Sequence, residues 1–127
     1  MALTAAQRDN WRQLWAKEAD LLAARRGQLL VVAQEVARAL HRLRPGLVVR
    51  VFGSVDGPGF HAASDLDLAV EGLPLAALLE AQALAGRQAD ATLARLGGNP
   101  VVVDLVRVEA LPEPWRERIR GRAPVLG

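Results

Sequence analysis

The stretch "FGSVDGPGFHAASDLDLAV", from Phe52 to Val70, joins a Gly-Ser turn to two aspartates that alternate with leucines. Gly53 and Ser54 close a valine-rich segment, and ten residues separate Ser54 from Asp65. Because side chains two residues apart on a strand leave the same face, roughly 6.6 Å apart, Asp65 and Asp67 are predicted to stand side by side. Neighbouring carboxylates repel each other, and burial strengthens the repulsion. The pattern therefore predicts a positive charge between them.

A third acid, Asp104, interrupts "VVVDLVRV", residues 101–108, which otherwise has the apolar pattern of a buried strand. An isolated carboxylate there would cost several kcal/mol unless it is paired or binds a cation. If this strand neighbours that of Asp65, the acids converge, and oxygen ligands without His or Cys favour Mg²⁺ or Mn²⁺. The simpler interpretations are a chance Asp-x-Asp pair on a surface strand, or a salt bridge to Arg50 or Arg107.

The Gly-Ser turn strengthens the metal interpretation. A glycine lets the backbone approach a ligand closely, and exposed N–H groups together with a serine hydroxyl can cradle phosphate oxygens. Gly53 and Ser54 stand at the end of one predicted strand, directly before the loop that leads to the acids. A phosphate cradle beside metal-binding acids indicates nucleotide chemistry.

The remaining pattern predicts a small sheet accompanied by helices. Three valine-rich segments are bounded by glycine or proline, and a long alanine- and leucine-rich segment is halted by two glycines. The predicted strands are residues 47–52, 65–70 and 100–108, and the predicted helices that follow the first strand are residues 74–96 and 112–120.

Residues 4–44 have a helical pattern, with Thr4 as the N-cap. One helix of that length would reach about 60 Å, far beyond an ordinary helix, so a break near Gly27 is predicted. The break would divide a helical extension, residues 1–28, from the core of a single domain, residues 29–127.

Both halves of this segment carry apolar stripes. The stripe of the second half has helical spacing and is predicted to cover a sheet. Its members are Leu29, Val32, Val36, Leu40 and Leu43. The first half places Trp11, Trp15 and two leucines, Leu14 and Leu22, on one side. Packing along the body is the commoner outcome for such a stripe, and contact with another chain, including a second copy, is the alternative.

Composition bounds the class of protein. The chain has 127 residues, a net charge of +2 and no cysteine, so disulfides and thiolate metal sites are excluded. It has no apolar run of about 18 residues, and its beginning is charged where a signal peptide is apolar. We expect one soluble, cytoplasmic domain. The basic run "WRERIRGR", residues 115–122, is equally typical of a solvated helix face or a protein docking surface, so direct nucleic-acid binding is not predicted.

Together these motifs resemble the minimal nucleotidyltransferase domain of the polymerase β superfamily: "GS", ten residues, "DLD" and a later "VDL". The resemblance covers about residues 29–126, including "LPEPWRERI", which looks like the closing helix of that family. It implies an α/β (α+β) fold with a short mixed sheet packed against helices. It also implies transfer of AMP from ATP to a hydroxyl group.

The resemblance assigns roles to individual residues. The nucleotide-binding residues would be Gly53, Ser54 and Ser64. Asp65 and Asp67 would bind one or both of two Mg²⁺ ions, for which Mn²⁺ can substitute. Asp104 would bind the second ion and help to activate the attacking hydroxyl. All three acids would thus be catalytic.

One segment departs from the family pattern. Members often follow Gly-Ser with an arginine-containing helical turn, whereas Val55–Gly59 carries an extra acid, Asp56, and a Gly-Pro-Gly run. Such a run cannot extend a stable helix, so we expect this loop to be mobile without ligand. The departure bears on nucleotide affinity. His61 is interpreted as a solvent-exposed loop residue.

Stand-alone domains of this family often act as antitoxins, which bind a small helical HEPN-type toxin and add AMP to one of its tyrosines. The resemblance therefore implies a protein acceptor. Two alternatives remain: a binding module that neutralises its partner by contact alone, and a transferase acting on a small molecule such as an aminoglycoside. In the second alternative, a homodimer formed through the N-terminal helices would supply the missing wall of the site.

Overall fold

A computed structural model describes residues 2–127. The described residues form three helices and four strands, with short 3-10 turns between some of them. They are α1 (Ala5–Leu43), β1 (Val48–Phe52), β2 (Leu66–Glu71), α2 (Leu78–Leu96), β3 (Val103–Arg107), α3 (Glu113–Arg122) and β4 (Val125–Leu126). The turns are η1 (Ser54–Asp56), η2 (Leu75–Ala77) and η3 (Val108–Ala110).

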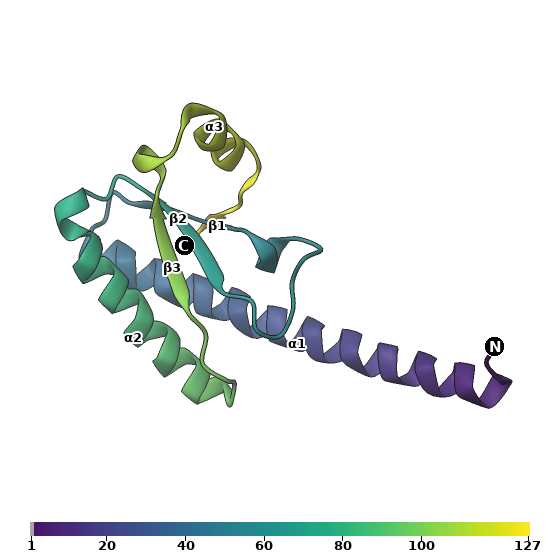
Figure 1. The fold of residues 1–127 in the computed structure, drawn as a ribbon. Helices are drawn as coiled ribbons and strands as arrows, with labels where there is room; N and C mark the ends of the chain where they lie inside the picture. Colours follow the sequence, from purple (N-terminus) through teal and green to yellow (C-terminus); the bar gives the residue numbers. More distant parts are fainter. Residues whose placement is uncertain (1) are drawn as a thin grey trace.

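The strands form one mixed sheet in the order β3-β2-β1-β4. β1 runs antiparallel to both β2 and β4, whereas β2 and β3 are parallel. Helices α1 and α2 cover one face of the sheet, and α3 lies on the other (Figure 1). This arrangement confirms the predicted α+β fold.

The main core lies between the sheet and the two long helices. The second-half stripe of α1 is buried there as predicted, except that Leu43, the last helical residue, is 39% exposed. From α2, alanines spaced by four residues face the core: Ala81, Ala85 and Ala89. Small side chains on one helix let the other approach closely, and α1 and α2 pack against each other. Gly97 then ends α2 in the left-handed conformation, as its position after the helical pattern predicts.

Helix α1 does not break near Gly27, so that prediction is wrong. It is a single helix of 39 residues, begun by a capping box in which Thr4 and Gln7 exchange hydrogen bonds. A glycine inside a helix costs only about 1 kcal/mol relative to alanine. Arg25, just before the glycine, donates to the carbonyls of Asn99 at 2.7 Å and Pro100 at 3.0 Å and so holds the helix to the body.

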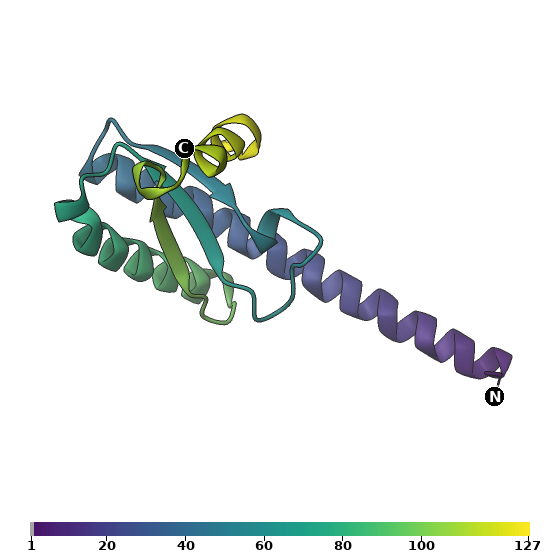
Figure 2. The ribbon, with the colours of Figure 1, turned by 45° about the horizontal axis from the view of Figure 1, so that its top comes forward.

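The first part of α1 projects beyond the body, as both ribbon views show (Figure 1, Figure 2). Residues 2–21 are all exposed, including Trp11 at 47% and Trp15 at 62%. The prediction that the tryptophan stripe packs along the body is therefore wrong: of its members only Leu22 packs against the core, and Trp11, Leu14 and Trp15 are exposed. The two indole rings lie beside each other, with centroids 6.0 Å apart. Even so, within residues 2–127 no helix combines the length and the apolar character that a membrane crossing requires.

Strand bounds differ slightly from the predicted ones. Asp65 lies just before β2, and β3 begins at Val103, three residues later than expected. Helix α2 is preceded by a 3-10 turn after Pro74. β4 was missed because two residues are too few to show an alternating pattern. It extends the sheet beside β1, with Val49 opposite Leu126.

Candidate active site

The predicted acids lie on the face of the sheet that α1 and α2 leave uncovered. On β2, Leu66 and Leu68 enter the main core, so Asp67 between them points to the opposite face. In the parallel pairing of β2 with β3, Asp67 is the register partner of Asp104. Register partners on adjacent strands project from the same face, so the two carboxylates are neighbours.

Asp65 adds a third negative charge to this cluster. Burial, then the charge of Asp104, and then that of Asp65 raise the pKa of Asp67 above its ordinary value. Among the side chains that the structure describes, no ion pair involves any of the three acids. The structure therefore makes Asp67 and Asp104 neighbours, with Asp65 near enough for its charge to act on Asp67, and no described ion pair compensates the three charges.

The salt-bridge interpretation of the acids fails. Arg50 instead lies near Glu71, with Nη1 3.7 Å from the Oε1 atom. Arg107 donates its Nε–H to the carbonyl oxygen of Leu73 at 2.7 Å. Both arginines that were candidates to neutralise Asp104 are thus engaged elsewhere.

Divalent cations fit the chemistry of this cluster, because adjacent carboxylates with hard oxygen donors and no protein counter-charge are what Mg²⁺ requires. In the described part of the chain, however, no three His, Asp or Glu side chains are grouped so that they could hold a metal ion as they stand. Some movement of the three carboxylates would therefore accompany metal binding.

The Gly-Ser turn packs directly against the acids. Gly53 has φ of 80° and ψ of −155°, a conformation that essentially only glycine adopts. A Cβ atom added there would stand 3.2 Å from Cγ of Asp67 and even closer to its Oδ2. Turn η1 begins at Ser54, whose carbonyl accepts a hydrogen bond from the N–H of Gly57 at 3.0 Å. The turn and Asp67 are thus neighbours in space, and their forming one nucleotide site stays a prediction.

The loop after the turn is held more firmly than expected. Val55 is buried, and Arg26 of α1 donates to the carbonyls of Val55 at 3.0 Å and Gly57 at 3.2 Å. Arg26 also lies over the ring of Phe60, 5.0 Å from its centroid. These contacts restrain the segment that the Gly-Pro-Gly run led us to expect as mobile. The orientation of Asp56 lies outside the side chains that the structure describes.

Ser64 and His61 close the far end of this loop. The Ser64 hydroxyl accepts a hydrogen bond from the His61 N–H at 2.9 Å, and the Ser64 N–H donates to the His61 carbonyl at 2.9 Å. Because Ser64 is buried and its hydroxyl is engaged in this way, its contact with a nucleotide stays a prediction. His61 is exposed, as interpreted from the sequence, and its Nδ1 accepts from the Ala63 N–H at 3.3 Å.

A cavity of about 350 Å³ opens beside Gly53, between the end of β1 and helix α3. The sequence had given "WRERIRGR" only as a basic surface, so this cavity was missed. The available signal was the four-residue spacing of Trp115 with Ile119 and of Arg118 with Arg122, which puts both pairs on neighbouring parts of one helix face. These four side chains line the cavity together with Phe52, Gly53 and Ala123.

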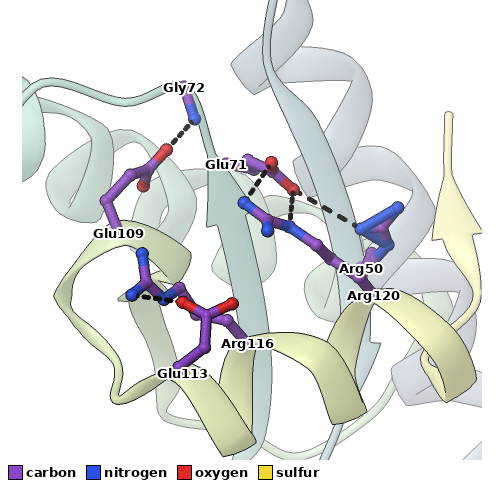
Figure 3. A network of polar contacts seen from close by, with 7 residues as sticks. All are labelled: Arg50, Glu71, Gly72, Glu109, Glu113, Arg116 and Arg120. Carbon is purple, nitrogen blue, oxygen red and sulfur yellow. Dashed lines mark hydrogen bonds and ion pairs between the residues drawn. The ribbon is translucent and has the colours of Figure 1, made fainter.

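Helix α3 is fixed to the open face by a small core and by ion pairs. Ile119 is buried against Ala69 of β2. Glu71, at the end of β2, receives Arg120 with Nη2 to Oε2 at 2.9 Å (Figure 3), and this contact raises the pKa of Arg120. A second carboxylate, that of Glu109, accepts the Gly72 N–H at 2.6 Å and ties η3 to the same edge (Figure 3).

Comparison of the sequence with models of protein families finds no match, and comparison with curated proteins finds none either.

Proposed function

We propose that the protein is a metal-dependent nucleotidyltransferase that transfers AMP from ATP to a hydroxyl group. One observation carries the proposal: Asp67 and Asp104 are register partners on the open face of the sheet, with Asp65 beside them and no described side chain neutralising the three charges. A protein that only binds a partner gains nothing from such a cluster, because uncompensated carboxylates destabilise the fold.

Asp65, Asp67 and Asp104 would hold two Mg²⁺ ions. When bound, the ions supply charge stabilisation for the phosphoryl group and lower the pKa of the acceptor hydroxyl. The Gly53-Ser54 turn would position the β- and γ-phosphates, since it packs against Asp67. Asp104 would orient the acceptor hydroxyl. Catalysis would then consist of positioning and charge stabilisation, as in other phosphoryl transfers.

The acceptor is proposed to be a tyrosine of a partner protein of the HEPN-toxin type. One observation supports a protein acceptor. The projecting helix presents an apolar stripe, with Trp15 at 62% and Leu14 at 59% exposed. Stripes of this size on a protein surface are typical of interaction sites.

The test uses labelled ATP, Mg²⁺ and the product of the adjacent gene, which the proposal expects to be a small helical ribonuclease. We expect the wild-type protein to label the ribonuclease and Asp67→Asn to abolish the label. Asp90→Asn is the matched control, because Asp90 is an exposed carboxylate of α2 on the far side of the sheet. Labelling that survives in an Asp67→Asn/Asp104→Asn variant would sink the proposal.

A contact-only binding module is the second candidate. It is favoured by the exposed tryptophan stripe, and by the need for the acids to move before they could hold a metal ion. The same experiment separates the two functions. If the Asp67→Asn variant still inhibits the ribonuclease fully, and the wild-type protein adds no label, neutralisation occurs by contact alone.

A further inference from the structure

We propose that the cavity between α3 and the end of β1 is the binding site for the nucleobase of the nucleotide. The inference rests on the proposed function and extends it to the part of the substrate that the acids and the Gly-Ser turn do not reach. It assigns a role to Trp115, Arg118 and Arg122, which no step of phosphoryl transfer uses.

Two residues that line the cavity are neighbours of Asp67. Phe52, which lines the cavity, is the antiparallel register partner of Asp67. Gly53 lines the cavity as well, and its backbone packs against the Asp67 side chain. A ligand whose phosphates lie over Asp67 can therefore place its other end in the cavity without leaving the open face of the sheet.

The order of the strands gives this site a direction. Along β1, β2 and β3 lie in turn the cavity, Asp67 and Asp104. The nucleobase would occupy the β1 side and the α-phosphate the middle. The acceptor hydroxyl then approaches from the β3 side, over Asp104. The cavity is thus on the side of the metal acids where the nucleotide has to extend, opposite the approach of the acceptor.

The lining of the cavity fits a flat heteroaromatic ring. Phe52, Ile119 and Ala123 provide apolar surface, and Trp115, which is 52% exposed, offers its indole. Bases stack on such aromatic side chains with little dependence on sequence. The volume of about 350 Å³ is at the lower end of the range of about 300 to 1,000 Å³ for small-molecule sites.

The positive charge of Arg118 and Arg122 favours a ligand that combines an electron-rich ring with anionic phosphate groups. The Arg118 guanidinium lies over the Trp115 ring, 4.8 Å from its centroid, and Arg122 follows one helical turn later. No carboxylate is among the residues that line the cavity. A base inserted beside Trp115 would meet a guanidinium at its polar edge, and the two arginines attract the triphosphate that follows it.

Helix α3, which provides most of the residues that line the cavity, is fixed against the sheet. On α3, Ile119 is buried against the sheet and Arg120 pairs with Glu71, which sets the rotation of the helix (Figure 3). Within the first turn of α3, Glu113 and Arg116 form an ion pair of 2.6 Å (Figure 3). Because Trp115 lies one helical turn before the buried Ile119, the anchored face of the helix keeps Trp115 beside the cavity.

Tryptophan fluorescence tests the inference directly. A Trp11→Phe/Trp15→Phe variant leaves Trp115 as the only tryptophan, since the chain has three. With Mg²⁺ present, we expect ATP and adenosine to quench its emission, and inorganic tripolyphosphate to bind without quenching it. Because both substituted residues lie on the projecting part of α1, they do not alter the site.

Affinity provides the second readout. Trp115→Ala is expected to weaken ATP binding about ten- to hundredfold, the effect of losing one base–aromatic stack, and to leave tripolyphosphate binding unchanged. Trp115→Phe should restore most of the ATP affinity. Trp15→Ala is the matched control and should have no effect.

The outcomes separate this inference from the proposed function. ATP that binds with Mg²⁺, requires Asp67, and neither quenches Trp115 nor responds to Trp115→Ala would overturn the nucleobase site and leave the transferase standing. If neither ATP nor tripolyphosphate binds, both proposals fall together.

Discussion

The ionised carboxylate of Asp67, which the proposed metal site requires, lowers the stability of the fold. Burial and the charges of Asp104 and Asp65 raise its pKa above the ordinary value of 3.8, so the folded protein binds this proton more tightly than the unfolded chain does. The free energy of unfolding therefore falls as the pH rises from 3.8 through the folded-state pKa. Above that pH interval the folded protein carries the full destabilisation caused by ionised Asp67, and below it this destabilisation is absent. At neutral pH, Asp67 destabilises the metal-free protein.

Asp67→Asn should therefore raise the melting temperature at neutral pH. After allowance for solvent screening the gain is a few tenths of a kcal/mol, or about 1 to 2 °C for a domain of this size. The gain should vanish below pH 3.8, where Asp67 is protonated. Mg²⁺ should stabilise the wild type and not the variant. Thermal melts at both pH values check this, and a lower melting temperature for the variant at neutral pH would contradict it.

Gly53 is the second residue on which the site depends. Gly53→Ala would place a Cβ atom 3.2 Å from Cγ of Asp67 and would require an L-residue at φ of 80°. We expect a loss of about 1 to 3 kcal/mol in the free energy of unfolding, measured by chemical denaturation. Gly59→Ala is the control, because nothing lies within 4 Å of its Cβ position and its φ is not in the left-handed range. Equal losses in the two variants would contradict the steric explanation.

At the scale of elements, the sequence predicted what depends on local pattern. Alternating valines located β1, and Asp104 within an apolar run located β3 and its acid. The convergence of Asp67 with Asp104 followed from strand periodicity once their strands were neighbours. The four-residue spacings on α3 indicate one helix face, but the cavity beside it could not be located from sequence, because its place depends on contacts between distant residues, such as Glu71 with Arg120.

The continuity of α1 also depends on distant contacts. Gly27 was expected to mark a break, but the two arginines directly before it, Arg25 and Arg26, bind loops of the body. Local propensity favoured a break by only about 1 kcal/mol, which is less than these hydrogen bonds supply together.

Gly27→Ala tests whether α1 is one helix in solution. Nothing lies within 4 Å of the added Cβ atom, so the substitution should stabilise the protein by about 0.5 to 1 kcal/mol. Gly86→Ala, at an equally open position inside α2, is the matched control and should give a similar gain. Chemical denaturation measures both. A gain at Gly86 with a loss at Gly27 would mean that the helix bends there.

On the scale of the whole molecule, the compact body and the projecting part of α1 have different roles. The body contains the core and the proposed site, whereas residues 2–21 contribute no buried side chain. Sequence periodicity identified both apolar stripes of α1. It could not tell which of them the body covers, because that depends on where the sheet ends.

Substitutions should separate the two parts. Leu40→Ala, in the core, should cost about 2 to 5 kcal/mol of stability, because Leu40 is fully buried. Trp15→Ala should change stability by less than about 0.5 kcal/mol and should weaken binding of the proposed protein partner at least tenfold. Denaturation and a pull-down or titration with the partner measure the two effects. Partner binding that is insensitive to Trp15 would place the interface elsewhere.

The contact between Arg26 and the loop after the Gly-Ser turn has a mechanical consequence. Because α1 is one unbroken helix, a molecule that binds its projecting part can tilt the helix relative to the body. Such a tilt would act on the carbonyls of Val55 and Gly57 through the Arg26 guanidinium that is hydrogen-bonded to both. Binding at the projecting part of α1 can thus shift the loop that borders the acids. The rate of amide hydrogen exchange at Gly57 would measure that shift.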